Sequence, residues 1–336
     1  MKKTILAALI ASTATTAFAG DIYSNDTTKV SFGGEVDAYL STMDTPSQQQ
    51  DADINVWAKV QMDAEQKISE SLTAFASFEI ESGSWYDGTN SNASFDDVLV
   101  GVKTDVWGVA VGEVGDLAES ADAIQKDDIT NEGMYMGSAG GNHRESEGKG
   151  AVAKAKFGPM VFVADVNTVT DSDVGNTYGV SADFQHEMFS VGATYIAGEA
   201  TAEDDYELYG VSASADVNGL YIAATYAEFE GADSYGFYHS GKVNNNTVVN
   251  GELTSGNTLG LAASYQVNEA RIYTTYAIAS IDDTATQKYG DTTNWVIGAD
   301  YEVASNILTF VEYQQAEADW EADDASTVVA GVYYSF

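Results

Sequence analysis

The stretch Ile54–Glu65, INVWAKVQMDAE, alternates apolar and polar side chains and decides the fold class. One face would carry Ile54, Val56, Ala58, Val60, Met62 and Ala64, and the other Asn55, Trp57, Lys59, Gln61, Asp63 and Glu65. Because successive residues of a strand point to opposite sides of a sheet, this pattern predicts a two-faced β-strand. The same alternation recurs in residues 177–185 and 259–267.

Sixteen such segments follow residue 20, with almost no helical periodicity between them. They lie near residues 28–41, 52–66, 71–82, 95–105, 107–114, 149–157, 159–168, 176–186, 188–198, 205–216, 219–229, 257–267, 269–280, 291–303, 305–315 and 325–336. Most are longer than the roughly 5–6 residues usual for strands of soluble sheets. Their length suits strands that cross a bilayer at a tilt, which need about 9–11 residues.

The connections between these segments alternate between short turns and long polar loops. Short turns follow the even-numbered segments, and the long loops include 83–94, 115–148, 230–256 and 316–324. This layout is typical of outer-membrane barrels. In hydrocarbon every backbone group must be paired, so a spanning sheet has to close on itself with its apolar face toward lipid. We therefore predict an all-β fold, a 16-stranded antiparallel transmembrane β-barrel around an aqueous channel.

The first residues have a different character from the rest of the chain. Met1–Lys3 is cationic, residues 4–18 are apolar or small, and Ala17-Phe18-Ala19 has the small-x-small pattern of a cleavage site. This predicts a secretory signal peptide over residues 1–19, which leaves residues 20–336 as one barrel domain. The alternative is a short buried helix.

Composition excludes several other classes of protein. The 336 residues include 52 Asp and Glu against 14 Lys and Arg, for a net charge of −38, and no Cys. A disulfide framework and a thiolate metal site are therefore excluded, and nucleic acid is not an expected partner because its binding needs a basic face. The 44% hydrophobic content is too high for a disordered acidic protein. No apolar run of about 18 residues follows the signal segment, so no transmembrane helix is predicted.

Aromatic residues gather near the ends of the segments, on or close to the apolar face. They are Tyr195, Tyr226, Tyr265, Tyr276, Trp295, Tyr301, Tyr313 and Tyr334. Amphipathic rings prefer the membrane–water interface, so the set supports a spanning barrel. For any single ring, the general preference of Tyr for strands is the alternative.

The last segment carries the most specific signal. Val328, Ala330, Val332, Tyr334 and Phe336 share one face, and Phe336 is the final residue. This resembles the assembly signal of outer-membrane barrels, and an ordinary edge strand is the alternative. With the sixteen segments, the signal peptide and the long 115–148 connection, residues 20–336 resemble the trimeric general porins of Gram-negative bacteria, most of all the acidic porins of marine gammaproteobacteria.

The resemblance implies that the 115–148 loop folds into the barrel as a constriction loop and that its carboxylates face basic residues on the wall. The loop acids would be Asp116, Glu119 and Asp122. Asp116 and Glu119 also fit a helix-capping box, and the three lie on one face of a short helix. Capping and solvation of a surface helix remain an equal alternative.

Basic residues on the second, fourth and sixth strands form the wall cluster in that family. Here these strands carry Lys59, Lys103 and Lys154, and all three have lumen-facing parity, as does Lys156. The family pattern is mainly Arg, whereas Lys is a flexible point charge, so a softer transverse field is expected. The usual family loop tip is missing. A solvated lumen charge is the alternative for each Lys.

The expected function is a passive, water-filled channel for ions and small hydrophilic solutes, a cation-selective general diffusion porin. Acidic residues with lumen parity support it because an acidic lining concentrates cations; they are Glu35, Asp37, Asp63, Glu65, Glu79, Glu81, Asp97, Asp165, Asp183, Asp216, Asp300, Glu302 and Glu312. Alternatives are an oligosaccharide-specific channel, suggested by Trp57, Phe75, Tyr221, Tyr273 and Tyr333, or a barrel acting mainly in adhesion or as a phage receptor. No catalytic arrangement surrounds the three His, so no enzyme is expected.

Expected partners follow from the resemblance: two further copies in a homotrimer, outer-membrane lipid and lipopolysaccharide, and the barrel-assembly machinery. The 83–94 loop, with Trp85 and Tyr86, is the candidate for latching a neighbouring barrel. No cofactor and no fixed metal site are expected. Acidic loops could hold Ca²⁺ or Mg²⁺, but no fixed ligand spacing appears, so a solvated acidic surface is the favoured interpretation.

Overall fold

The computed structural model describes residues 20–336 except 47, 114–118, 134–135, 137–148, 171, 245–246 and 250. The expected signal peptide, residues 1–19, lies outside the described residues. Within the described part, 16 antiparallel strands form a closed barrel. They are β2 (Thr28–Asp44), β3 (Gln49–Lys67), β4 (Thr73–Ser84), β5 (Asn90–Lys103), β6 (Trp107–Gly112), β7 (Gly150–Phe157), β8 (Met160–Asn167), β9 (Thr177–Gln185), β10 (Phe189–Glu199), β11 (Asp205–Val217), β12 (Leu220–Ala232), β17 (Thr254–Val267), β18 (Ala270–Ile281), β19 (Gly290–Ala304), β20 (Ile307–Ala318) and β21 (Ala325–Ser335). The predicted fold class is confirmed.

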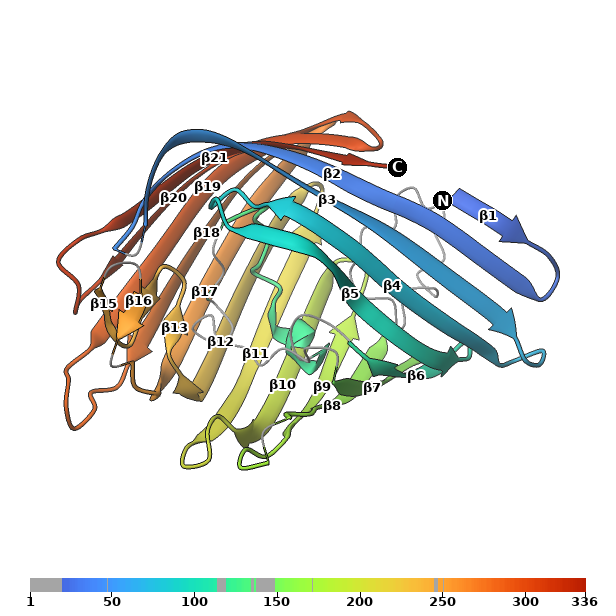
Figure 1. Cartoon of the computed structure of the whole chain (residues 1–336), viewed down its shortest axis with the longest axis horizontal. Helices are drawn as coiled ribbons and strands as arrows, with labels where there is room; N and C mark the ends of the chain where they lie inside the picture. The colour runs from blue at the N-terminus through green and yellow to red at the C-terminus, as the bar shows by residue number, and fades with distance from the viewer. Residues whose placement is uncertain are drawn as a thin grey trace.

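The barrel closes where the first and last of these strands pair. β2 and β21 are in register from Glu35↔Ser335 to Asp44↔Ser326, and Figure 1 shows them side by side. The terminal Phe336 continues the ladder, because its N–H donates to the Gly34 carbonyl at 2.9 Å and its own carbonyl accepts from Gly34 at 3.0 Å. A short strand that the sequence reading missed, β1 (Gly20–Ser24), pairs with β2 on the same edge, beyond the end of β21.

Strand facing agrees with the alternation in the sequence. Ile54 and Val56 are 71% and 57% exposed on the outside, while Trp57 is 5% exposed on the lumen side. The aromatic residues predicted at the membrane interface, called the tyrosine girdle below, also face outward. Seven of them are each more than a third exposed: Tyr195, Tyr226, Tyr265, Tyr276, Trp295, Tyr301 and Tyr334. Tyr313 is partly exposed. Among the described residues no helix is long and apolar enough to cross a membrane.

Tight turns join the strands at one end of the barrel. Asn218 and Gly219 between β11 and β12 have φ of 54° and 84°, as a two-residue hairpin turn requires. Asn268, between β17 and β18, has a φ of 53° and serves the same purpose. This end corresponds to the predicted short-turn side.

The other end carries longer connections that pack on one another. The 233–253 connection contains β13 (Ser234–Tyr235), β14 (Tyr238–His239), β15 (Lys242–Asn244) and β16 (Thr247–Val249). Trp320, from the β20–β21 loop, lies edge-on to the rings of Tyr235, Tyr238 and Tyr289 at 6.2, 6.2 and 5.4 Å. Three separate connections thus share one aromatic cluster.

The expected long loop over residues 83–94 is shorter in the structure than the sequence predicts. β4 and β5 stay paired out to Ser84↔Asn90, so only residues 85–89 form the connection. Trp85 stacks on lumen-facing Trp57 at 4.4 Å, and Tyr86 packs edge-on against Tyr39 at 6.4 Å. Trp85 and Tyr86 therefore contact their own barrel wall, and a latch to a neighbouring barrel through them stays a prediction. Burial of these large rings against apolar neighbours favours the inward position.

Candidate pore constriction

The connection between β6 and β7 turns into the barrel. Its short 3-10 helix η2 (Glu119–Ile124) contacts the lumen side of β8, β9, β10 and β11, and Figure 1 shows its coil within the ring of strands. Ala121, Ile124 and the later Met136 are buried in one apolar cluster with wall residues, among them Ile196, Leu208 and Ala227. This part of the loop therefore packs against apolar side chains on the lumen face of β10–β12.

Two glycines let the loop approach the wall closely. A Cβ on Gly192 would collide with the backbone carbonyl oxygen of Ala123, and one on Gly179 would collide with the side chains of Ser120 and Asp165. Because Gly179 and Gly192 have no side chain, η2 can lie directly against the lumen face of β9 and β10.

Wall side chains hold the backbone of the first half of the loop. The Ser120 N–H donates to Asp165 Oδ2 at 2.6 Å, and the Thr225 hydroxyl donates to the Ile124 carbonyl at 3.0 Å. Just beyond η2, the Tyr221 hydroxyl donates to the Lys126 carbonyl at 2.6 Å. The Lys126 ammonium forms an ion pair with Asp183 at 2.7 Å.

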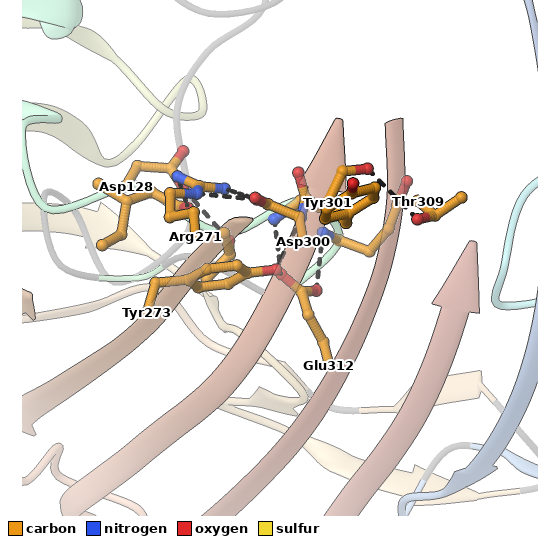
Figure 2. A network of polar contacts seen from close by, with 11 residues as sticks. Asp128, Arg271, Tyr273, Asp300, Tyr301, Thr309 and Glu312 are labelled. Atoms are coloured by element: carbon orange, nitrogen blue, oxygen red, sulfur yellow. Dashed lines mark hydrogen bonds and ion pairs between the residues drawn. The ribbon is translucent and has the colours of Figure 1, made fainter. Parts of the chain in front are cut away.

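Figure 2 shows the contacts that hold the loop tip. The N–H groups of Asn131 and Glu132 donate to the two carboxylate oxygens of Glu312 at 2.6 and 2.9 Å, and the Tyr273 hydroxyl donates to the same carboxylate at 2.6 Å. Glu312 is only 1% exposed. Three donors on one buried carboxylate form strong, charge-assisted hydrogen bonds.

Arg271 completes this network from β18. Its guanidinium donates to Asp300 Oδ2 through Nε at 2.8 Å and Nη2 at 2.5 Å, and through Nη1 to the Ile129 carbonyl at 3.1 Å. It also lies over the Tyr273 ring, 4.3 Å from the centroid. One planar side chain therefore links the loop backbone, a wall acid and a wall ring.

These anchors correct one expectation about charge. Asp165, Asp183, Asp300 and Glu312 have lumen parity as predicted, but each is engaged by the loop or by a cation that also contacts it. They hold the loop, because its N–H groups, its Lys126 ammonium and the wall residue Arg271 bind to them, and they do not line open lumen. Lumen parity could be read from the sequence, whereas the loop's path over those strands could not.

The predicted loop acids have different environments. Glu119 is buried and forms an ion pair with Lys154. Asp122 is exposed on the lumen side of η2. Asp116 lies outside the described residues. The structure thus brings one predicted loop acid together with one predicted wall base.

The other wall bases pair with acids on their own wall. Lys59 lies 3.0 Å from Glu79, and Lys103 lies 2.5 Å from Glu65. Lys156 is partly exposed and makes no ion pair with the described residues. Because cross-strand carboxylates compensate these ammonium groups, the basic wall expected from the resemblance is largely neutralised.

Glu132 and Arg271 are constriction residues that sequence reasoning missed. The Tyr333 hydroxyl donates to Glu132 Oε1 at 2.5 Å, and burial raises the pKa of the Glu132 carboxyl to about 7. An arginine with the lumen parity of Tyr273 was the available signal for Arg271, since the chain contains only two arginines. Glu132 has no comparable signal, because it lies in a loop without periodicity.

Metal binding gains no support from side-chain geometry. Among the residues the structure describes, no three or more His, Cys, Asp or Glu side chains are arranged to hold a metal ion. His143 lies outside the described residues, and His186 and His239 lie in connections.

A closed antiparallel sheet with an apolar exterior, a polar lumen and a loop tied inside it defines a transmembrane channel of the outer-membrane barrel class. The sequence pattern of the family described as Gram-negative porin matches residues 6–320. The chain belongs to this family and is an outer-membrane porin, a diffusion channel of the Gram-negative cell envelope.

Two curated relatives agree with this family. The chain is 24% identical over 366 residues to the outer membrane porin protein OmpD of Citrobacter koseri, which covers 95% of this chain and 94% of that protein. It is also 24% identical to the outer membrane porin protein LC of Enterobacteria phage PA-2, covering 90% of this chain and 87% of that one. These relatives are porins, a class of non-enzymatic channels.

Solved porins share the fold at lower sequence identity. OmpF of Salmonella typhi, solved in complex with daunomycin, has a TM-score of 0.74 at 20% identity, covering 94% of this chain and 100% of that chain. The anion-selective porin from Comamonas acidovorans has a TM-score of 0.71 at 12% identity, covering 92% and 100%. At such identities the likeness shows the fold alone.

Proposed function

We propose that this porin passes ions and small hydrophilic solutes with a preference for cations. The observation that carries the proposal is the pairing of the wall bases. Lys59, Lys103 and Lys154 each form an ion pair with a carboxylate, whereas the loop acids Asp122 and Asp128 are exposed on the lumen side. The charge that remains along the path is therefore negative.

The course of the loop supports an acidic path. The contacts described above tie the loop to strands from β7 round to β21, so we expect the aqueous path to run beside β2–β6. That wall also carries Glu35, Asp63 and Glu81, all at partly exposed positions. Acidic linings raise the local cation concentration and repel anions. The Debye length is about 8 Å at physiological ionic strength, so wall charges act across a narrow opening.

The ion selectivity of this channel has to come from its side chains, because the same fold is compatible with a preference for cations and with a preference for anions. The Comamonas acidovorans porin of similar fold is described as anion-selective. The sign for this chain therefore rests on its own surplus of carboxylates and on the compensation of its bases.

The test is the reversal potential of the purified protein in a planar bilayer under a KCl gradient near 0.1 M. A potential of the sign for K⁺ over Cl⁻ is expected, and a potential of the opposite sign would refute the proposal. A matched control is Glu187→Gln, which removes one carboxylate from a short turn outside the lumen and should leave the potential unchanged.

We also infer a homotrimer in which residues 1–19 act as the export signal and Tyr334 and Phe336 are recognised by the barrel-assembly machinery. The outer face of β2, β3 and β4 supports a protein-covered side, because it exposes no Tyr or Trp, whereas β10–β21 present the outward-facing tyrosines; its exposed large side chains are Phe32, Val36, Leu40, Ile54 and Val56. A trimer form has been solved for OmpT of Vibrio cholerae, a structural neighbour. Lipopolysaccharide would contact the girdle side. Crosslinking that yields only monomers in mild detergent would contradict the trimer.

An oligosaccharide track gains no support from the described lumen. The Tyr221 hydroxyl donates to the loop backbone and the Tyr273 hydroxyl donates to Glu312. Phe75 belongs to a separate cluster with Leu99, Ala110 and Val152. Trp57 and Tyr333 alone of the five candidate rings belong to one aromatic cluster. We therefore propose no second function.

A further inference from the structure

An aromatic patch lines the lumen next to the loop tip, and the diffusion function does not account for it. Trp57 stacks on Trp85 at 4.4 Å, and Tyr39 packs edge-on against Tyr86 at 6.4 Å and against Tyr333 at 6.3 Å. We call these five rings the lumen aromatic patch. Trp57 and Tyr39 are almost fully buried, whereas Trp85, Tyr86 and Tyr333 remain partly exposed on the lumen side.

The connection between β4 and β5 is held inside the barrel by polar contacts. The Ser41 hydroxyl donates to the Tyr86 carbonyl and the Gln48 amide donates to the Asp87 carbonyl. Trp85 itself closes the turn, since its N–H donates to the Thr89 carbonyl at 3.0 Å. Trp85 and Tyr86 are therefore fixed parts of the lumen wall.

A buried carboxyl group lies within this patch. Asp37 is directly opposite Trp57 on β3 and directly opposite Tyr333 on β21. It is 2% exposed, and its Oδ2 accepts from the Tyr39 hydroxyl at 3.0 Å. Its Oδ1 is buried and has no hydrogen-bond partner among the described residues. A buried acceptor without a donor is costly, so Asp37 leaves a polar group beneath the rings that the described residues do not satisfy.

A second carboxylate reaches the patch from the loop. Glu132 accepts the hydroxyl of Tyr333 at 2.5 Å and is partly exposed. Aromatic faces beside carboxylates are the chemistry that recognises ammonium and methylated ammonium groups.

A cation of the protein already uses one of these rings. Lys59 Nζ lies 5.8 Å from the centroid of the Trp57 ring. The same ammonium is bound to Glu79 at 3.0 Å, so it is committed to the wall and leaves the exposed parts of Trp85 and Tyr86 to solutes.

We propose that the lumen aromatic patch is a binding subsite for permeating organic cations with an ammonium or methylated ammonium group. This deepens the proposed function and rests on it only in requiring that cations enter the pore. The ring faces of Trp85 and Tyr86 contact the apolar surface of the head group, and the Glu132 carboxylate supplies the attractive field. A neutral sugar would use the rings but not the charge, so the Glu132 carboxylate beside the rings favours the cation.

The test records K⁺ current through the purified full barrel in a planar bilayer at 0.1 M KCl while choline is added. The matched probe is 3,3-dimethyl-1-butanol, which has the shape of choline with carbon in place of the charged nitrogen. Choline is expected to reduce the current saturably, and the neutral probe is expected to have no effect at the same concentration. Cation–π contacts of this kind predict that Trp85→Leu raises the half-blocking choline concentration about fivefold or more.

The controls separate the patch from the barrel. Trp85→Phe keeps an aromatic face and should retain most of the block, and Trp295→Leu, which removes an outward-facing tryptophan, should leave it unchanged. Should Trp85→Leu fail to form channels, Tyr86→Leu replaces it. Unchanged K⁺ over Cl⁻ reversal potentials in these variants show that the constriction is intact.

The proposal is overturned if choline and its neutral isostere block equally or if Trp85→Leu and Tyr86→Leu leave the choline block unchanged. It is equally overturned if maltotriose blocks with a dependence on Trp85 that choline lacks, since the patch would then take neutral sugars. Failure of the proposed function has a different signature, a reversal potential that favours Cl⁻ in the wild-type protein.

Discussion

Glu312 illustrates how much of the constriction depends on single side chains. It accepts the N–H groups of two consecutive loop residues and the hydroxyl of Tyr273 while almost completely buried. Residues 131 and 132 of the loop tip have no regular secondary structure. Their N–H groups therefore donate to this carboxylate and not to the carbonyl groups of a paired strand. Hydrogen bonds to a charged group contribute about 1.5–3 kcal/mol each.

Replacing Glu312 should therefore loosen the loop tip. Glu312→Gln keeps the shape but removes the charge and turns one acceptor oxygen into a donor that faces loop N–H groups. We expect larger current fluctuations and a higher mean single-channel conductance, measured in planar bilayers. Glu302→Gln is the matched control, since it removes a carboxylate from an exposed position near a turn. Equal current noise in both variants would contradict the anchoring role.

Titration of Glu132 should make the cation preference of the channel depend on pH. Its pKa is raised to about 7, so the carboxyl is neutral below that pH and negative above it. The groups that face it are Tyr333 and Tyr39 on the wall, Glu312 beneath the tip and Asp87 on the neighbouring turn. Cation preference should rise as the pH goes from about 6 to about 8, measured as the reversal potential under a KCl gradient. Glu132→Gln should flatten this rise, and a wild-type potential constant over the range would count against it.

At the level of elements, η2 depends on the strand beneath it. Gly192 on β10 lies directly under the Ala123 carbonyl, and the hydroxyl of neighbouring Thr194 donates to the Ser120 carbonyl. The strand thus supplies both the space and the hydrogen bond that a six-residue helix cannot provide for itself, because helices this short are not stable alone.

Gly192→Ala should displace η2, because the new methyl group would occupy the position of a backbone oxygen. Overpacking of this kind costs about 1–3 kcal/mol. We expect an altered single-channel conductance and a lower melting temperature, measured by thermal unfolding in detergent. Ala193→Val adds more volume to the next residue, whose side chain is exposed on the outside of the same strand, and should change neither. Wild-type conductance in Gly192→Ala would show that the loop does not rest on this strand.

For the whole molecule, charge and closure act together. The net charge of −38 is distributed over loops and lumen, while the barrel exterior is apolar with a tyrosine-rich border. Closure makes this possible, because a sheet without edges can face hydrocarbon on one side and water on the other. Long-range electrostatics then decides which ions enter.

Salt should therefore weaken the selectivity of the intact channel. The Debye length falls from about 8 Å at 0.15 M to about 3 Å at 1 M, so wall charges lose their effect on the centre of the path. The reversal potential for a fixed KCl ratio is expected to approach zero as the mean concentration rises to 1 M. A potential independent of concentration would point to selection by direct contact and not by the field of the lining.

Several features of this porin are local and could be predicted from the sequence. The alternation of side chains sets the strands and their facing, so Lys59, Lys103 and Lys154 could be assigned to the lumen. Turn residues such as Asn218 mark the tight end. These predictions succeed because strand periodicity and turn chemistry involve residues that are close along the chain.

The contacts between lumen residues and the loop depend on the folded arrangement of the chain. Asn131 and Glu312 are 181 residues apart, and no periodicity relates them. The same holds for the inward turn that brings Trp85 onto Trp57. The pattern along each strand is enough to predict a closed, acidic barrel that faces lipid. The structure of its constriction depends on packing between segments whose meeting is set by barrel closure and by the path of one irregular loop.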